Sequence, residues 1–114
     1  MRRLPEILAE RASAERVELD LRVPADLEYF AGHFPGAPVL PGVVQLDWCV
    51  RLASGRLPLR GGFRALEQIK FLAPISPKDR LTLTLRARQE GTRLDFQYAA
   101  SGKKLSSGTL LFGA

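Results

Sequence analysis

His33 is the single histidine of this 114-residue chain and the side chain best suited to move a proton near neutral pH. Its unperturbed pKa is about 6.5. It lies between Gly32 and Phe34 in a proline-rich segment, and the fixed φ angle of proline restricts the backbone that carries the imidazole. A lone histidine in a loop is more often structural or merely exposed, so residue type leaves both interpretations open.

Asp47 is a second candidate because it interrupts an apolar stretch that has helical character. A carboxylate in such surroundings costs free energy unless it is paired, hydrated or protonated. Arg51 lies one helical turn later and offers an ion pair. Alternatively, burial raises the pKa of Asp47 and makes it a general acid, although a nearby helix N-terminus opposes that rise. The sequence alone leaves both alternatives open.

Gly42 follows Pro41 at the expected start of the same helix. Its backbone N–H has no side chain to block a ligand, so it offers a site where negative charge on a carbonyl oxygen is stabilised. The alternative is that glycine only relieves crowding after Pro41. Trp48 and Cys49 have the spacing of ordinary packing residues, and no basic residue adjoins the thiol.

Hydrophobic periodicity predicts an α+β domain with one buried helix and an antiparallel sheet that wraps it. The helix is expected over residues 42–53, since proline precedes it and Ser54-Gly55 closes it. Apolar residues surround nearly its whole circumference, which indicates burial on most sides. The other expected elements are a short helix at 4–12, a strand at 17–23, an ordered loop at 24–41, and strands at 63–71, 81–87, 94–98 and 104–112. The last three strands form an antiparallel meander.

Composition limits the class of protein. Residues 1–114 suit one domain, and a core this small makes dimerisation a reasonable expectation. Seventeen Lys and Arg against 12 Asp and Glu give a net charge of +5, spread without the basic run of a nucleic-acid arm. The single cysteine excludes an intramolecular disulfide. The start lacks the apolar stretch of a signal peptide, and no apolar run approaches the roughly 20 residues of a membrane span, so we expect a soluble, cytoplasmic protein.

One continuous stretch carries a family resemblance. It reads Gly32-His33-Phe34-Pro35-Gly36-Ala37-Pro38-Val39-Leu40-Pro41-Gly42-Val43-Val44-Gln45-Leu46-Asp47. It resembles the signature of the 3-hydroxyacyl-acyl-carrier-protein dehydratases, G-H-F-P-x-x-P-x-x-P-G followed on the helix by Glu or Asp. Every fixed position is present. The stretch 68–79 is similar to the strand and proline turn of that family, and the similarity covers roughly residues 16–112.

The resemblance implies a hot-dog fold, in which a curved antiparallel sheet wraps a long central helix, and a homodimer. It implies that His33 of one subunit faces Asp47 of the other. His33 would remove the C2 proton of a 3-hydroxyacyl thioester, Asp47 would hold or protonate the departing hydroxyl, and the Gly42 N–H would polarise the thioester carbonyl. The Val39 carbonyl would orient the imidazole. The implied substrate is carried on an acyl carrier protein, with no metal or redox cofactor.

An acyl tunnel at the subunit boundary is a further implication. Its expected lining residues are Phe34, Val43, Leu46 and Trp48. The run Gln45-Leu46-Asp47-Trp48 is similar to the small dehydratases of aryl-polyene pathways.

The chain departs from the broad dehydratase branch in two ways. Asp47 replaces a glutamate, as it does in the branch that also isomerises, but Gln45 and Trp48 differ from that branch, so isomerase activity does not follow. The leader is shorter, so part of an N-terminal helical layer is expected to be missing. Two other functions stay open: a hot-dog acyl thioesterase, which leaves His33 unexplained, and a non-catalytic carrier-binding or acyl-binding subunit.

Overall fold

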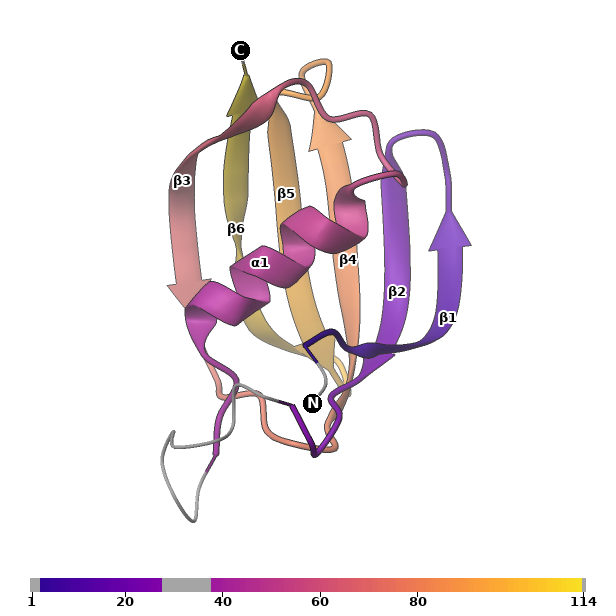
Figure 1. Cartoon of the computed structure of the whole chain (residues 1–114), viewed down its shortest axis with the longest axis vertical. Helices are drawn as coiled ribbons and strands as arrows, with labels where there is room; N and C mark the ends of the chain where they lie inside the picture. The colour runs from indigo at the N-terminus through magenta and orange to yellow at the C-terminus, as the bar shows by residue number, and fades with distance from the viewer. Residues whose placement is uncertain (1–2, 28–37, 114) are drawn as a thin grey trace.

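The computed structural model describes residues 3–27 and 38–113. These residues form one helix and a six-stranded sheet with the order β1-β2-β4-β5-β6-β3, in which neighbouring strands are antiparallel (Figure 1). The elements in chain order are β1 (Glu6–Ala12), β2 (Arg16–Arg22), α1 (Gly42–Ala53), β3 (Gly62–Phe71), β4 (Arg80–Arg88), β5 (Arg93–Ala100) and β6 (Lys103–Gly113). The expected β4-β5-β6 meander is confirmed.

The core lies between α1 and the sheet, because the helix runs diagonally across one face of the strands (Figure 1). Strict alternation along β2, β4 and β5 directs every second side chain into this core. Leu19, Leu83 and Tyr98, one from each of these strands, are fully buried together with Trp48 of the helix. A helix wrapped by a curved antiparallel sheet is the hot-dog arrangement, so the predicted fold class is confirmed.

The helix has two unlike sides. Its start after Pro41 and its end at Ser54 agree with the sequence. The side facing the sheet is buried, whereas Val43 is 75% exposed and Leu46 and Val50 are only partly covered. The chain's own sheet therefore covers one side of an apolar helix and leaves the other side open.

The helix predicted at residues 4–12 is wrong, because the structure places β1 there. This strand pairs with β2 in antiparallel register from Glu6↔Arg22 to Ala12↔Val17, with an irregularity between Ile7 and Ala9. The conformation of β1 depends on this pairing with β2. Side chains add to the pairing, since the Arg11 guanidinium donates to both Asp20 carboxylate oxygens, each at 2.9 Å. Local composition could not reveal a strand that depends on its neighbour.

The two edges of the sheet are formed by β1 and β3, on opposite sides of the molecule (Figure 1). The β3 edge exposes Phe63, Leu66 and Phe71. The register of β3 with β6 shifts between Phe63 and Ala65 and again between Glu67 and Lys70. Among the described residues, no helix has the length and apolarity needed to cross a bilayer.

Candidate active site

Gly42 and Val39 lie together at the N-terminal end of α1. They line a hollow of about 270 Å³ whose remaining walls are Leu40, Gln45, Phe71, Leu72, Ala73 and Pro74. The hollow therefore combines the start of the helix with the segment that follows β3. His33 and Phe34, the other candidates predicted for this region, lie outside the described residues.

The start of α1 is crowded at Gly42. A Cβ atom at this position would lie 2.6 Å from Cζ of Phe71, so the ring of this half-exposed side chain would have to move aside. The Pro41 carbonyl accepts from the Val44 and Gln45 N–H groups at 3.1 and 3.2 Å, so the helix begins with the N–H groups of Gly42 and Val43. These groups have no carbonyl one turn earlier in the helix and are oriented to stabilise negative charge. Relief of crowding and an oxyanion role are thus compatible.

Asp47 forms the ion pair predicted from its spacing to Arg51. The Arg51 Nε donates to Asp47 Oδ2 at 2.7 Å, and the two side chains are 61% and 43% exposed. Residues of this chain therefore do not bury the carboxylate. The burial required by the general-acid alternative would have to come from another surface.

Beside Asp47 lies a second hollow of about 390 Å³ on the open side of the helix. Its walls are Val43, Leu46, Asp47, Val50, Phe63, Leu66 and Leu110. Asp47 is the only charged residue among them, so a carboxylate borders an otherwise apolar space. The structure thus brings together Asp47 and two residues predicted for an acyl tunnel, Val43 and Leu46.

Trp48 faces the opposite way and does not line this hollow. It is fully buried between the helix and the sheet, and its indole N–H donates to the Arg3 carbonyl at 2.9 Å. Trp48 therefore packs in the core of the single chain, and the tunnel role expected for it stays a prediction. Cys49 is buried as well, and burial raises the pKa of its thiol to about 12, so the expectation of an inert packing residue holds.

Gln45 is a buried polar residue to which the sequence assigned no role. Its Nε2 donates to the Leu40 carbonyl at 3.3 Å, and its Oε1 accepts from Ser106 Oγ at 2.7 Å. The Tyr98 hydroxyl donates to the Gln45 main-chain carbonyl at 2.7 Å. A glutamine in an apolar helix was the only available signal, since its partners are distant in sequence.

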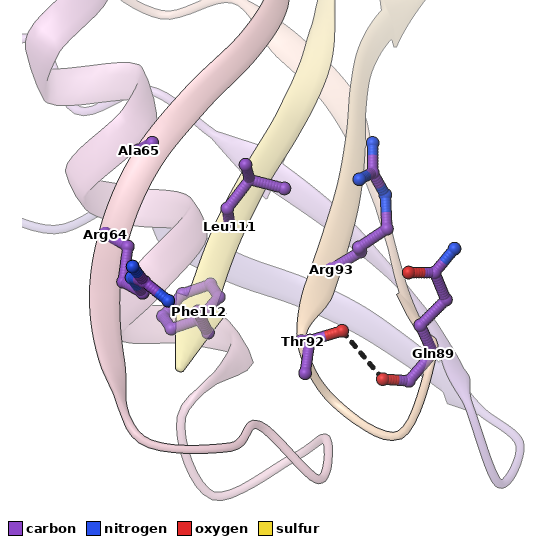
Figure 2. A pocket seen from close by; sticks show the side chains of 7 residues that line it. All are labelled: Arg64, Ala65, Gln89, Thr92, Arg93, Leu111 and Phe112. Atoms are coloured by element: carbon purple, nitrogen blue, oxygen red, sulfur yellow. Dashed lines mark hydrogen bonds between the residues drawn. The ribbon is translucent and has the colours of Figure 1, made fainter. Parts of the chain in front are cut away.

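A third hollow, of about 410 Å³, is separate from all of these candidates (Figure 2). It lies near the β4-β5 turn, where the Thr92 hydroxyl donates to the Gln89 carbonyl at 2.7 Å. Its other lining residues are Arg64, Ala65, Arg93, Leu111 and Phe112. Glu67 pairs with Arg93 at 2.5 Å and offsets part of the positive charge there. Within residues 3–27 and 38–113, no three His, Cys, Asp or Glu side chains cluster closely enough to hold a metal ion.

Sequence comparisons identify relatives over most of the chain. The ApeI-like family, described as ApeI dehydratase, matches residues 9–109. A FabZ 3-hydroxyacyl-[acyl-carrier-protein] dehydratase from Erythrobacter litoralis is 32% identical over 105 residues, covering 81% of this chain and 70% of the relative. The corresponding protein of Thermus thermophilus is 31% identical over 124 residues, covering 96% and 87%.

Solved structures extend the similarity to three dimensions. A chain of the dehydratase heterocomplex ApeI:P from Xenorhabdus doucetiae superposes with a TM-score of 0.87 at 28% identity, covering 97% of both chains. An uncharacterized protein from Erwinia carotovora subsp. atroseptica has a TM-score of 0.81 at 38% identity, covering 95% and 94%. The matched region contains both the helix with Asp47 and the sheet that wraps it, and the chain belongs to the ApeI-like dehydratase family, among the relatives of the FabZ dehydratases.

Proposed function

We propose that the protein removes water from 3-hydroxyacyl thioesters on an acyl carrier protein and forms the trans-2-enoyl thioester. The observation that carries this proposal is the family match over residues 9–109, which spans the helix, the candidate site and the sheet. The FabZ relatives are named for this reaction. The subgroup match favours a role in polyene-type or fatty-acid biosynthesis.

The proposed roles divide the elimination between two side chains and one backbone group. His33 takes the C2 proton, and Asp47 holds the departing hydroxyl and supplies the proton with which it leaves as water. The Gly42 N–H stabilises the charge that develops on the thioester oxygen while C2 is deprotonated. The Val39 carbonyl orients the imidazole. Support comes from the placement of Gly42 and Val39 on one hollow and of Asp47 at the border of an apolar one.

A homodimer would complete the site, with His33 of one subunit facing Asp47 of the other. The open side of α1 and the β3 edge, with Val43 and Leu66 exposed, support an interface there. Covering this side would enclose the hollow next to Asp47 and convert it into the end of an acyl tunnel lined by Val43 and Leu46, with Phe34 as a further predicted wall. A partner surface would also supply the burial that Asp47 lacks in the single chain.

The test follows interconversion of crotonyl and 3-hydroxybutyryl groups on purified acyl carrier protein, with longer and aryl-conjugated substrates in parallel. His33→Ala and Asp47→Asn are each expected to lower kcat by about 10²- to 10⁴-fold, the range of lost acid-base catalysis. Inert protein on all substrates, or unchanged activity of His33→Ala, contradicts the proposal. Release of free thiol that persists in His33→Ala would indicate a thioesterase instead.

A second candidate function has one observation in its favour. The similar Xenorhabdus doucetiae chain belongs to a heterocomplex, so this chain could act as one subunit of a mixed dimer. Purified protein that is inactive alone, and that gains activity on forming a stable complex with a related subunit, would favour this alternative. Activity of the chain by itself would exclude dependence on such a subunit.

A further inference from the structure

A buried polar network ties the start of α1 to two strands of the sheet and to the segment that precedes the helix. We infer that Gln45, at its centre, is a positioning residue that holds residues 39–42 in the geometry needed for dehydration. The inference rests on the proposed function, because it concerns the Val39 carbonyl and the Gly42 N–H of that site. Gln45 acts through Leu40, and no contact with substrate is required of it.

Leu40 is held at both of its backbone polar groups. Its N–H donates to the Ile75 carbonyl at 2.7 Å, and its carbonyl accepts from Gln45 Nε2 at 3.3 Å. The Leu40 side chain is buried as well. Because Leu40 is adjacent to Val39 and two residues before Gly42, these bonds fix both the group proposed to orient the histidine and the group proposed to bind the thioester oxygen.

The orientation of the Gln45 amide is determined from the other side. Ser106 Oγ donates to its Oε1 at 2.7 Å, which leaves the NH₂ group to face the Leu40 carbonyl. The fully buried Tyr98 donates its hydroxyl to the Gln45 main-chain carbonyl, so the same helical turn is also anchored to β5. Gln45 itself is 3% exposed. Gln45 is thus bonded to β6 through its side-chain oxygen, to β5 through its main-chain carbonyl and to Leu40 through its side-chain NH₂ group.

An apolar side chain of the same length would fill similar space but would take one partner from the Leu40 carbonyl and one from the Ser106 hydroxyl. Loss of a partner from a buried polar group costs about 1–3 kcal/mol, so the amide also contributes to stability, and the experiment must separate that contribution from positioning. A catalytic geometry is more demanding, since a displacement of about 1 Å can lower the rate by about a hundredfold. The placement of Leu40 and its neighbours is therefore a second role for the amide.

The experiment compares Gln45→Met, Ser106→Ala and Thr109→Val in the full chain. Thr109 is the matched control, because it is also a buried hydroxyl residue of β6 but donates to Asp95 at 2.8 Å, away from Leu40. Steady-state kinetics give kcat and KM with acyl-carrier-protein substrate. Amide hydrogen exchange at Leu40, followed by NMR, reports the position of the segment independently of activity.

Gln45→Met is expected to lower kcat about tenfold or more with KM changed less than about threefold, and to accelerate exchange of the Leu40 amide. Ser106→Ala should produce a smaller change in the same direction, while Thr109→Val stays within twofold and leaves Leu40 exchange unaltered. The inference is overturned if Gln45→Met folds and has the same kcat and the same Leu40 amide exchange rate as the Thr109→Val control. If Gln45→Met does not fold, Ser106→Ala decides by the same two measurements. If the wild-type chain has no dehydratase activity, the proposed function fails, and Leu40 exchange still decides whether Gln45 positions the segment.

Discussion

At the scale of single residues, Asp95 shows how the outer face of the sheet uses charge. It is partly buried, which by itself raises its pKa, but hydrogen bonds from Arg88 and Thr109 lower it further than burial raises it. The net pKa lies below the ordinary value of 3.8. A carboxyl whose pKa is lower in the folded state contributes stability above its unfolded pKa and loses that contribution as the pH falls through the folded value.

We predict that Asp95→Asn lowers the free energy of unfolding by about 1 kcal/mol at pH 7, with the size limited by the partial exposure of the pair. The difference from wild type should shrink below pH 4 and disappear once Asp95 is protonated. Urea denaturation at several pH values measures both effects. Glu90→Gln is the control, because Glu90 meets Arg60 only in an exposed pair at 3.5 Å and should change stability little. A difference that persists unchanged at low pH would contradict the assigned cause.

Cys49 gives a second prediction at this scale. Burial raises the pKa of its thiol to about 12, and its Sγ contacts the Tyr98 hydroxyl at 3.7 Å. The thiolate is therefore scarce at pH 8, and the sulfur is shielded from solvent. An aromatic disulfide reagent that reacts with thiols should therefore label the native protein far more slowly than the urea-unfolded protein. Rapid labelling of the native chain would show that the core opens at α1.

Some of these residue-level features were predictable and others were not. The Asp47–Arg51 pair follows from i, i+4 spacing on a helix, a rule that needs no tertiary structure. The hydrogen bonds of Gln45 could not be predicted in this way, because Tyr98 and Ser106 are 53 and 61 residues away from Gln45 in the sequence. Sequence marks Gln45 as unusual in an apolar helix, but only the fold identifies its partners.

At the scale of elements, local signals predicted those parts whose side chains alternate or whose ends carry turn residues. The helix from Gly42 and the strands with strict alternation are of this kind. For β1 the sequence predicts a helix, because the apolar pattern of this segment is weak and its conformation comes from pairing with β2. β3 pairs with β6, which is distant in the sequence, and the alternation along β3 does not reveal this partner.

Two turns of the sheet allow a matched test of what glycine contributes. Gly91, in the β4-β5 turn, has φ +84°, and a Cβ there would lie 2.1 Å from the Pro58 carbonyl oxygen. Gly102, between β5 and β6, has φ +75° and nothing within 4 Å of such a Cβ. Gly102→Ala should lower the free energy of unfolding by about 1 kcal/mol, because alanine is strained at a positive φ angle. Gly91→Ala adds a clash with the backbone and should lower the free energy of unfolding by about 3 kcal/mol or more.

Urea unfolding of the two alanine variants measures this difference, and a shared left-handed φ makes Gly102 the control for strain without a clash. Equal losses would mean that the Pro58 segment moves away at little cost. The larger loss at Gly91 would show that the β4-β5 turn supports residues 57–60, where the Arg60 N–H also donates to the Gly91 carbonyl at 2.9 Å.

At the scale of the whole molecule, sequence and structure disagree about α1 in an informative way. The apolar circumference of the helix predicted burial on most sides, yet the sheet covers only one side and leaves Val43 exposed next to the hollow bordered by Asp47. Phe63 and Leu66 of β3 continue this apolar surface. The exposed apolar side of the helix is removed from water only if a second surface covers it. This is the physical basis for expecting the site to form between subunits.

We predict that Leu66→Lys separates the subunits, because association would have to desolvate an ammonium group in an apolar surface. The dimer dissociation constant should rise at least about a hundredfold, equivalent to about 2.7 kcal/mol, and kcat per chain should fall in parallel with the dimer population. Sedimentation velocity over a range of concentrations, with activity measured at the same concentrations, checks both effects. Ile7→Lys is the control, since Ile7 is an exposed apolar residue on β1, at the opposite edge of the sheet. Full activity of a monomeric Leu66→Lys chain would show that one subunit holds a complete site, and equal dissociation of both variants would place the interface elsewhere.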